Sequence, residues 1–274
     1  MIGLHDWQAG PAILLRDLVL AADPVIGRAA MTMTVHNLAY HGWTPAADVP
    51  QLGLTTDQGL LAWDAAGIDL LGAALERAEL ANTVSPTFAA EALTAGYGMG
   101  LDPILRRKGD RFTGILNGLD TALWDPAADP VLAAPYSLGA RGGKAACRAD
   151  LLERNGLDPA DPGFVVGMIG RLDPQKGFDL AAGMAEPFLA AGGRLIVQGS
   201  GDPAIAALLH AAVEAHPGRI ALVERFDREM ARRIYAGADL FLMPSRFEPC
   251  GTGQMIALRY GTPPVVRRTG GLAD

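Results

Sequence analysis

The chain has 274 residues, half of them hydrophobic, and its 30 acidic against 23 basic side chains give a formal net charge of −7. This length and composition allow one large or two ordinary α/β domains and argue against global disorder. The negative charge disfavours a nucleic-acid-binding surface, and no apolar stretch reaches the roughly 18 residues that a membrane span requires.

The first half shows few regular elements. Ser85 and Pro86 supply the N-cap and first-turn proline of a helix that follows a short strand. The half has too few strands for a complete doubly wound domain, so it is expected to be the final part of one. The expected strands are residues 31–36, 82–84 and 112–116, and the expected helix of the Ala-, Asp- and Pro-rich segment 120–162 is about 143–154.

The second half alternates short apolar runs with amphipathic segments. Such strands are typical of a parallel sheet covered on both faces, which indicates a doubly wound, Rossmann-like unit. Ligands of these sheets bind at the carboxyl ends of strands. The expected strands are 163–169, 194–198, 219–223, 239–243 and 264–267, and the expected helices are about 178–191, 203–214, 228–236 and 253–260.

The first candidate binding loop is GRLDPQKG, residues 170–177, which contains Arg171 and Lys176. A planar guanidinium and a compact ammonium could neutralise a departing diphosphate, and the following helix would add amide donors. The alternative is a pair of solvated surface cations, which is the usual state of these residue types.

The second candidate loop is SRFEPCGTG, residues 245–253. Glu248 could orient sugar hydroxyls or stabilise positive charge at an anomeric carbon. The amides of Gly251, Thr252 and Gly253 could hold phosphate at the start of the next helix. The proline and glycines could equally be ordinary turn residues.

Three further features carry weaker signals. The imidazole of His5 could bond a sugar hydroxyl, although a lone histidine is more often structural or exposed. His5 and His36 do not have the spacing of metal ligands, so no metal is expected. Cys250 is expected to be a small buried side chain because no partner base is recognisable. The glycine-rich turn at Thr269, Gly270 and Gly271 could face the same cleft or merely reverse the chain.

The two cysteines form no disulfide framework, which is typical of a reducing compartment. The N-terminal residues lack the basic segment and apolar run of a signal peptide. We therefore expect a cytoplasmic protein.

In chain order, these motifs resemble those of bacterial glycogen synthases and plant starch synthases. The segments are HDWQAG, TVHNLAYHG, TVSPTFAAE, GILNGLD, GRLDPQKG, GSGD, AGADLFLMPSRFEPCG and ALRYGTPPVVRRTGGLAD. The resemblance covers nearly the whole chain, and the last two segments are highly specific.

The resemblance implies a GT-B glycosyltransferase with two Rossmann-like doubly wound α/β domains, both incomplete in this chain. Residues 1–119 would be the C-terminal part of the acceptor-side domain, 120–162 a linker region, and 163–274 the N-terminal part of the nucleotide-sugar-binding domain. The implied reaction transfers glucose from ADP-glucose to the non-reducing end of an α-1,4-glucan such as glycogen with retention. It needs no metal and no other cofactor.

The resemblance also implies residue roles. Arg171 and Lys176 match the family's donor-diphosphate residues, and Glu248 matches its essential carboxylate near the donor glucose. His5 matches a histidine that contacts the transferred sugar, and Asn117 matches an asparagine nearby.

Further matches come with departures from the family pattern. Cys250 matches a cysteine that lines the site, and Thr269 begins the family's later glycine-rich loop. Phe226 stands where the family usually has a tyrosine against the nucleotide base, so stacking would survive and a phenol hydrogen bond would not. The chain reads EPCGTGQ where the family usually reads EPCGLTQ, so Gly253 replaces a threonine whose hydroxyl would help to hold phosphate.

No Lys-Thr-Gly-Gly-Leu loop precedes His5, so the resemblance implies an internal fragment of a synthase. Two other interpretations stay open. One is a non-catalytic truncated remnant that binds glucan or a partner protein, against which the joint presence of Arg171, Lys176 and Glu248 argues. The other is a related GT-B enzyme, such as a sucrose synthase-like protein or a nucleotide-sugar epimerase, which the HDW and EPCG motifs disfavour.

Overall fold

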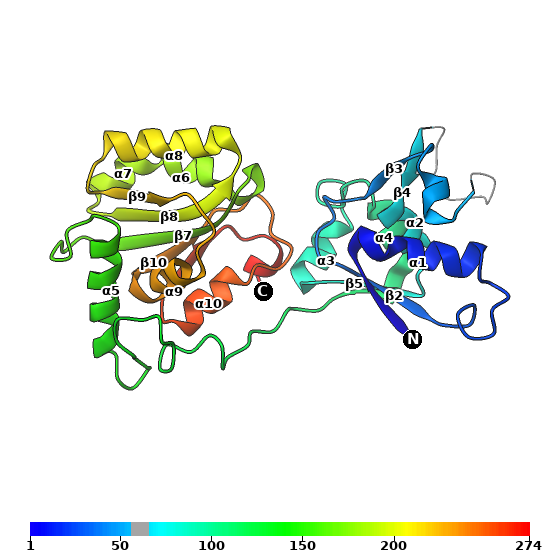
Figure 1. The fold of residues 1–274 in the computed structure, drawn as a ribbon, viewed down its shortest axis with the longest axis horizontal. Helices are drawn as coiled ribbons and strands as arrows, with labels where there is room; N and C mark the ends of the chain where they lie inside the picture. The colour runs from blue at the N-terminus through cyan, green and yellow to red at the C-terminus, as the bar shows by residue number, and fades with distance from the viewer. Residues whose placement is uncertain (56–65) are drawn as a thin grey trace. The chain divides into compact units, whose positions relative to one another are not determined.

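The computed structural model describes residues 1–55 and 66–274, and the chain forms two compact units (Figure 1). The first unit comprises residues 1–117 together with 269–274, and the second comprises residues 118–268. Within the described residues, no helix has both the length and the apolar character needed to cross a membrane.

These units differ in two places from the division expected from the sequence. The segment expected to be a linker, residues 120–162, packs as part of the second unit, and residues 269–274 pack with the first. The first difference arises because apolar side chains of this segment enter the second unit's core. The second arises because Thr269 and Gly270 hydrogen-bond to Glu91 of the first unit.

The first unit is built on a parallel four-stranded sheet in the order β1-β2-β5-β6. Its core lies where the buried residues of β2 meet helices α1, α2 and α3. Its strands are β1 (Ile2–His5), β2 (Met31–Val35), β5 (Leu80–Thr83) and β6 (Phe112–Gly114), with an antiparallel pair β3 (Trp43–Pro45) and β4 (Gly67–Asp69). Its helices are α1 (Asp6–Leu18), α2 (Leu70–Arg77), α3 (Pro86–Ala92) and α4 (Asp102–Lys108), with 3-10 turns η1 (Val49–Leu52), η2 (Gly109–Arg111) and η4 (Gly270–Leu272).

The expected cap at α3 is confirmed, because Ser85 Oγ accepts a hydrogen bond from the amide of Phe88 at 2.8 Å and Pro86 takes the first helical position.

Strand β1 and helix α1 were not expected from the sequence. Helix α1 contains Gly10 and Pro11, both of which disfavour a helix interior. Packing overrides that local preference: a Cβ at Gly10 would lie 2.9 Å from the carbonyl oxygen of Leu70, so the glycine permits close contact with α2.

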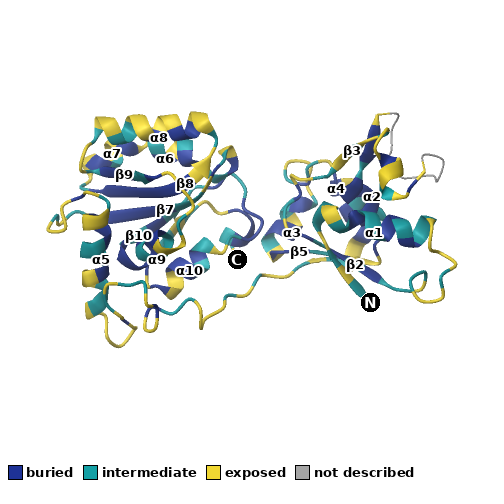
Figure 2. Cartoon of the chain, in the orientation of Figure 1, coloured by how far each residue is buried: buried dark blue, intermediate teal, exposed yellow. Residues whose placement is uncertain are grey.

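The second unit is the expected doubly wound one. Its five strands are all parallel, in the order β11-β10-β7-β8-β9, and helices lie on both faces of the sheet (Figure 1). Alternate buried strand residues enter two separate cores, one against α5, α9 and α10 and the other against α6, α7 and α8. Figure 2 shows these central strands as the most buried part of the unit.

Most of the second unit's expected elements are confirmed, with two corrections. Strands β7 and β8 extend beyond the expected ends, so Arg171 and the glycines of GSGD lie within strands and not in loops. The expected helix 178–191 is broken at Met184, because Pro187 has no amide hydrogen to continue one helix. The elements are α5 (Gly142–Arg154), β7 (Val165–Leu172), η3 (Pro174–Lys176), α6 (Phe178–Gly183), α7 (Ala185–Ala190), β8 (Arg194–Gly201), α8 (Pro203–Ala215), β9 (Ile220–Val223), α9 (Arg228–Gly237), β10 (Leu240–Met243), α10 (Gly253–Arg259) and β11 (Pro264–Val266).

Residues 118–141 form an irregular strap over the second unit, held by a buried carboxylate. The Asp129 side chain is fully buried; it accepts hydrogen bonds from Tyr260 Oη at 2.5 Å and from Arg232 Nη1 at 3.0 Å. The same guanidinium lies 5.2 Å from the centre of the Trp124 ring. Burial raises the pKa of Tyr260, and the hydrogen bond with the Asp129 carboxylate raises it further.

Candidate functional site

The strand order of the second unit defines where a ligand is expected. The chain runs outward from β7 through β8 to β9, then crosses to β10 on the other side of β7. The gap between the carboxyl ends of β7 and β10 is therefore the topological switch point, the usual ligand site of open α/β sheets. The two candidate loops of the sequence follow these two strands.

At this switch point the structure brings Lys176 and Glu248 together. Lys176 Nζ donates to Glu248 Oε2 at 2.6 Å, and Ser245 Oγ donates to the same oxygen at 3.1 Å. Glu248 is only 5% exposed, and the Lys176 side chain is 23% exposed. Lys176 is thus a paired cation, and the interpretation as a solvated surface charge is wrong for this residue.

Local structure fixes the turn that carries Lys176. Asp173 Oδ1 accepts the amide of Gln175 at 2.8 Å and so caps the 3-10 turn η3. Gly177 follows with a φ of 73° in the left-handed region, where glycine is favoured. A Cβ at this glycine would lie 2.5 Å from the carbonyl oxygen of Pro244, so the turn packs directly on the loop of Glu248.

Arg171 and Phe226 line a second feature, a cavity of about 280 Å³ at the carboxyl ends of β7 and β8. The Arg171 side chain is 59% exposed and lies 4.0 Å from Asp173. The Phe226 ring is 78% exposed, and the Arg228 guanidinium lies 5.7 Å from its centre. An exposed aromatic face beside cations is chemically suited to a nucleotide base with its phosphates.

The glycine-rich start of α10 agrees in part with expectation. Cys250 is buried, as expected for a small apolar side chain. Gly251 has a φ of 70°, and Gly253 is the first residue of α10. The exposed Thr252 makes no side-chain cap, while Gln254 Nε2 donates to the carbonyls of Cys250 and Gly251, both at 2.9 Å.

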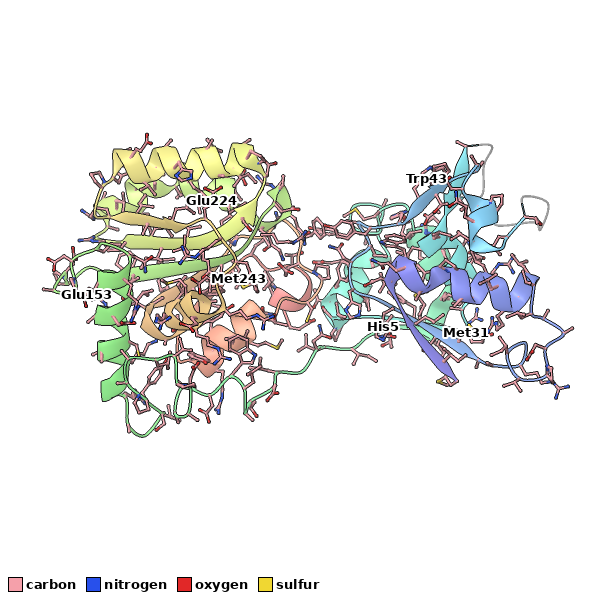
Figure 3. The ribbon with its side chains drawn as sticks, in the orientation of Figure 1. His5, Met31, Trp43, Glu153, Glu224 and Met243 are labelled. Carbon is pink, nitrogen blue, oxygen red and sulfur yellow. The ribbon has the colours of Figure 1, made fainter. Side chains whose placement is uncertain are left out.

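His5 and Asn117 belong to the first unit. His5 ends β1, as Figure 3 shows, and its Nδ1 lies 2.9 Å from Nε2 of His36 at the end of the neighbouring strand β2. Asp6 has a φ of 56°, unusual for a residue with a side chain, and its carboxylate accepts the His36 amide at 2.7 Å. Asn117 is half-buried after β6.

The turn at Thr269, Gly270 and Gly271 is buried in the first unit. Thr269 Oγ1 lies 3.1 Å from both carboxylate oxygens of Glu91, and the Gly270 amide donates to the same group at 3.1 Å. The Glu91 carboxylate thus occupies hydrogen-bond donors of the turn that was expected either to face the ligand cleft or to reverse the chain.

Several residues at the site had not been singled out from the sequence. Arg246 and Gln175 lie within the two motifs, but their roles depend on contacts between loops some 70 positions apart, which no local pattern encodes. Ser245 bonds Glu248 three positions further along the same loop. Within residues 1–55 and 66–274, no group of three or more His, Cys, Asp or Glu side chains is placed to hold a metal ion.

Two family models match the chain. Residues 1–107 match the model of the starch synthase catalytic domain, and residues 163–274 match glycosyl transferases group 1. A glycogen synthase of Anaeromyxobacter dehalogenans (strain 2CP-C) is 45% identical over the whole chain, which covers 58% of that relative. A glycogen synthase of Paracidovorax citrulli is 44% identical, with 55% of it covered.

A solved structure is equally informative. The catalytic domain of starch synthase IV from Arabidopsis thaliana, described as bound to ADP and acarbose, matches all of this chain with a TM-score of 0.92 and 36% identity. The chain belongs to the glycogen and starch synthase family. The expected GT-B type of α/β fold is thereby confirmed. The chain spans 55–58% of the length of these glycogen synthases and 57% of that solved chain.

Proposed function

We propose that the protein acts in glycogen biosynthesis by transferring glucose from ADP-glucose to the non-reducing end of an α-1,4-glucan, with retention of anomeric configuration. The observation that carries the proposal is the Lys176–Glu248 pair at the switch point, at 2.6 Å. It supplies one cation for a diphosphate and one carboxylate for a sugar within a single hydrogen-bond length. The glycogen synthases similar to this chain and the ADP-bound starch synthase support the choice of substrates.

In this proposal Arg171 and Lys176 neutralise the diphosphate while the bond between it and the glucose C1 breaks. Glu248 faces the sugar and stabilises the positive charge that develops at C1. The acceptor hydroxyl attacks from the face that the diphosphate leaves, and its proton passes to the departing phosphate oxygen. No metal and no cofactor take part. A trapped covalent glucosyl-Glu248 would contradict this path.

The remaining assignments follow the same proposal. Phe226 stacks on the adenine within the cavity that it lines, and Gly251, Thr252 and Gly253 approach the phosphates. His5 and Asn117 contact the transferred sugar. Residues 1–119 serve the acceptor side, and residues 163–268 bind the nucleotide sugar. Residues 120–162 pack with the nucleotide-sugar-binding residues. The sequence has only two cysteines, too few for the disulfide framework of secreted domains, which suits a cytoplasmic enzyme.

Two assays test the proposal. Isothermal titration calorimetry with ADP and UDP should show binding of ADP in preference to UDP. Incubation with labelled ADP-glucose and glycogen should place label at non-reducing ends, with the α configuration by NMR. Faster incorporation of label from UDP-glucose would contradict the proposed donor. The absence of both ADP binding and label incorporation would contradict the proposed activity.

A further inference from the structure

Arg246 lies in the loop that carries Ser245 and Glu248, but its guanidinium bonds residues outside this loop. Its guanidinium forms two parallel bonds with the Asp179 carboxylate, Nη1 to Oδ1 at 2.9 Å and Nη2 to Oδ2 at 2.7 Å. Such bidentate pairs fix the relative orientation of both partners. Arg246 lowers the pKa of Asp179 through this hydrogen bond, so the carboxylate stays charged near neutral pH.

The same arginine is also bonded to the turn that carries Lys176. Arg246 Nη1 donates to the Pro174 carbonyl at 2.6 Å, and the Arg246 amide donates to the Gln175 carbonyl at 2.7 Å. From the opposite direction, Gln175 Nε2 donates to the carbonyl of Phe247 at 3.1 Å. Gln175 is 8% exposed, so this bond lies inside the protein.

These bonds join two segments that are far apart in sequence. One segment, residues 173–179, runs from η3 into α6; the other, residues 244–250, follows β10. Each carries one member of the Lys176–Glu248 pair. The distance between ammonium and carboxylate is therefore set by how the two segments are held, and not by the pair alone.

We propose that Arg246 and Asp179 are positioning residues that clamp the Lys176 turn against the Glu248 loop. The clamp lets Lys176 exchange its bond to Glu248 for one to a diphosphate without a change in the distance between the two segments. This inference rests on the proposed function for its role in catalysis. It concerns two residues whose side chains are engaged with each other and not with the reacting atoms.

Side-chain exposures of 40% for Arg246 and 33% for Asp179 place the clamp at the surface. Ion pairs of this kind add little to global stability, so Arg246→Ala and Asp179→Ala should fold. The proposal is tested with these two variants and with the exchanged pair Arg246→Asp/Asp179→Arg. Arg154→Ala is the matched control, since Arg154 is 50% exposed and bonds Asp150 at 2.7 Å on α5.

Hydrogen–deuterium exchange supplies the first measurement and needs no activity. Either single variant should accelerate exchange in both segments, 173–179 and 244–250, while the exchanged pair restores part of the protection and Arg154→Ala changes neither segment. Acceleration confined to the mutated segment, or an exchanged pair no better protected than the singles, would overturn the clamp.

Steady-state kinetics supply the second measurement. Displacement of catalytic groups by about 1 Å can cost on the order of a hundredfold in rate, so the single variants should lower kcat by about tenfold to a hundredfold with little change in KM for ADP-glucose. A raised KM with unchanged kcat and unchanged exchange would instead make Arg246 a direct phosphate ligand and overturn the proposal. The single variants could show faster hydrogen exchange in both segments although the wild-type protein neither binds ADP nor transfers glucose. That result would support the clamp and contradict the proposed function.

Discussion

The ammonium of Lys176 lies 2.6 Å from the buried carboxylate of Glu248, so each neutralises the other's charge. A diphosphate that binds Lys176 must compete with Glu248 for it. Donor affinity and catalysis should therefore respond differently to loss of the carboxylate.

Glu248→Ala should lower kcat by about a hundredfold to a thousandfold, the usual cost of removing a group that stabilises transition-state charge. The affinity for ADP should stay the same or rise, because the variant frees Lys176. Calorimetry with ADP and initial rates of glucose transfer measure the two effects. Glu224→Ala is the control, since Glu224 is an exposed carboxylate bonded to His210 (labelled in Figure 3). A loss of ADP binding equal to the loss of rate would contradict the assigned role.

Lys176→Ala should destabilise the second unit by about 1–3 kcal/mol, because it leaves a buried acceptor with one fewer partner. Adding Glu248→Gln should recover part of this loss, since the amide removes the unpaired charge. Urea unfolding of the wild-type protein, the single variant and the double variant measures the free energies. Equal stability of the single and double variants would show that the pair does not hold the two loops.

Gly177→Ala should destabilise more than Gly218→Ala. The two glycines have nearly the same φ, 73° and 72°, so the backbone cost of about 1–2 kcal/mol applies to both. A new Cβ at Gly177 meets the Pro244 carbonyl oxygen at 2.5 Å. At Gly218, apart from its two chain neighbours, no atom of the part of the chain that the structure describes lies within 4 Å. The difference between their free energies of unfolding isolates the close contact between the two loops. Equal losses would show that the loops separate easily.

Phe226→Ala should weaken ADP binding by about 1–3 kcal/mol, the typical value for a base stacked on an aromatic ring. Phe226→Tyr should retain the affinity. Because the ring is 78% exposed, neither change should alter stability. Leu208→Ala, at a 51% exposed apolar side chain on α8, is the control for calorimetry. Unchanged ADP affinity in Phe226→Ala would show that the adenine base does not bind in this cavity.

The stability of the first unit should depend on the protonation of His41. Its bond to Asp69, 2.7 Å long, raises the pKa of His41 above its ordinary 6.5. The stabilisation is complete below the unfolded-state pKa and is lost as pH rises through the folded-state pKa. His41→Gln should therefore flatten the fall in the first unit's unfolding free energy as the pH rises above the ordinary histidine pKa of 6.5. An unchanged slope in His41→Gln would show that the pair contributes nothing.

The second unit was largely predictable because its signals are local. Apolar runs such as that beginning at Val165 and caps such as that before α8 determine strands and helices within a few residues of themselves. Local signals also failed in places. Strand β7 continues through Arg171 because its pairing with β8 extends to the pair Leu172 and Gly201, which lie 29 positions apart in the sequence.

The site was predictable in composition but not in connection. Lys176 and Glu248 could be singled out by residue type and by their positions after strands. Their bond, the Arg246–Asp179 clamp and the contact of Glu91 with Thr269 all join distant segments, so they depend on the folded backbone. Likewise α1, with Gly10 and Pro11, forms through packing on α2 against its own local preference.

The strap gives the second unit its own fluorescent reporter. Trp124 is the only tryptophan between residues 118 and 268. Its ring packs edge-on against Tyr235, with centroids 6.1 Å apart, beneath the Arg232 guanidinium. In a protein whose tryptophans at 7, 43 and 63 are replaced by phenylalanine, a red shift of the emission maximum would mark the moment at which the strap leaves the surface. Local opening there could then be followed in real time, separately from the melting of the first unit.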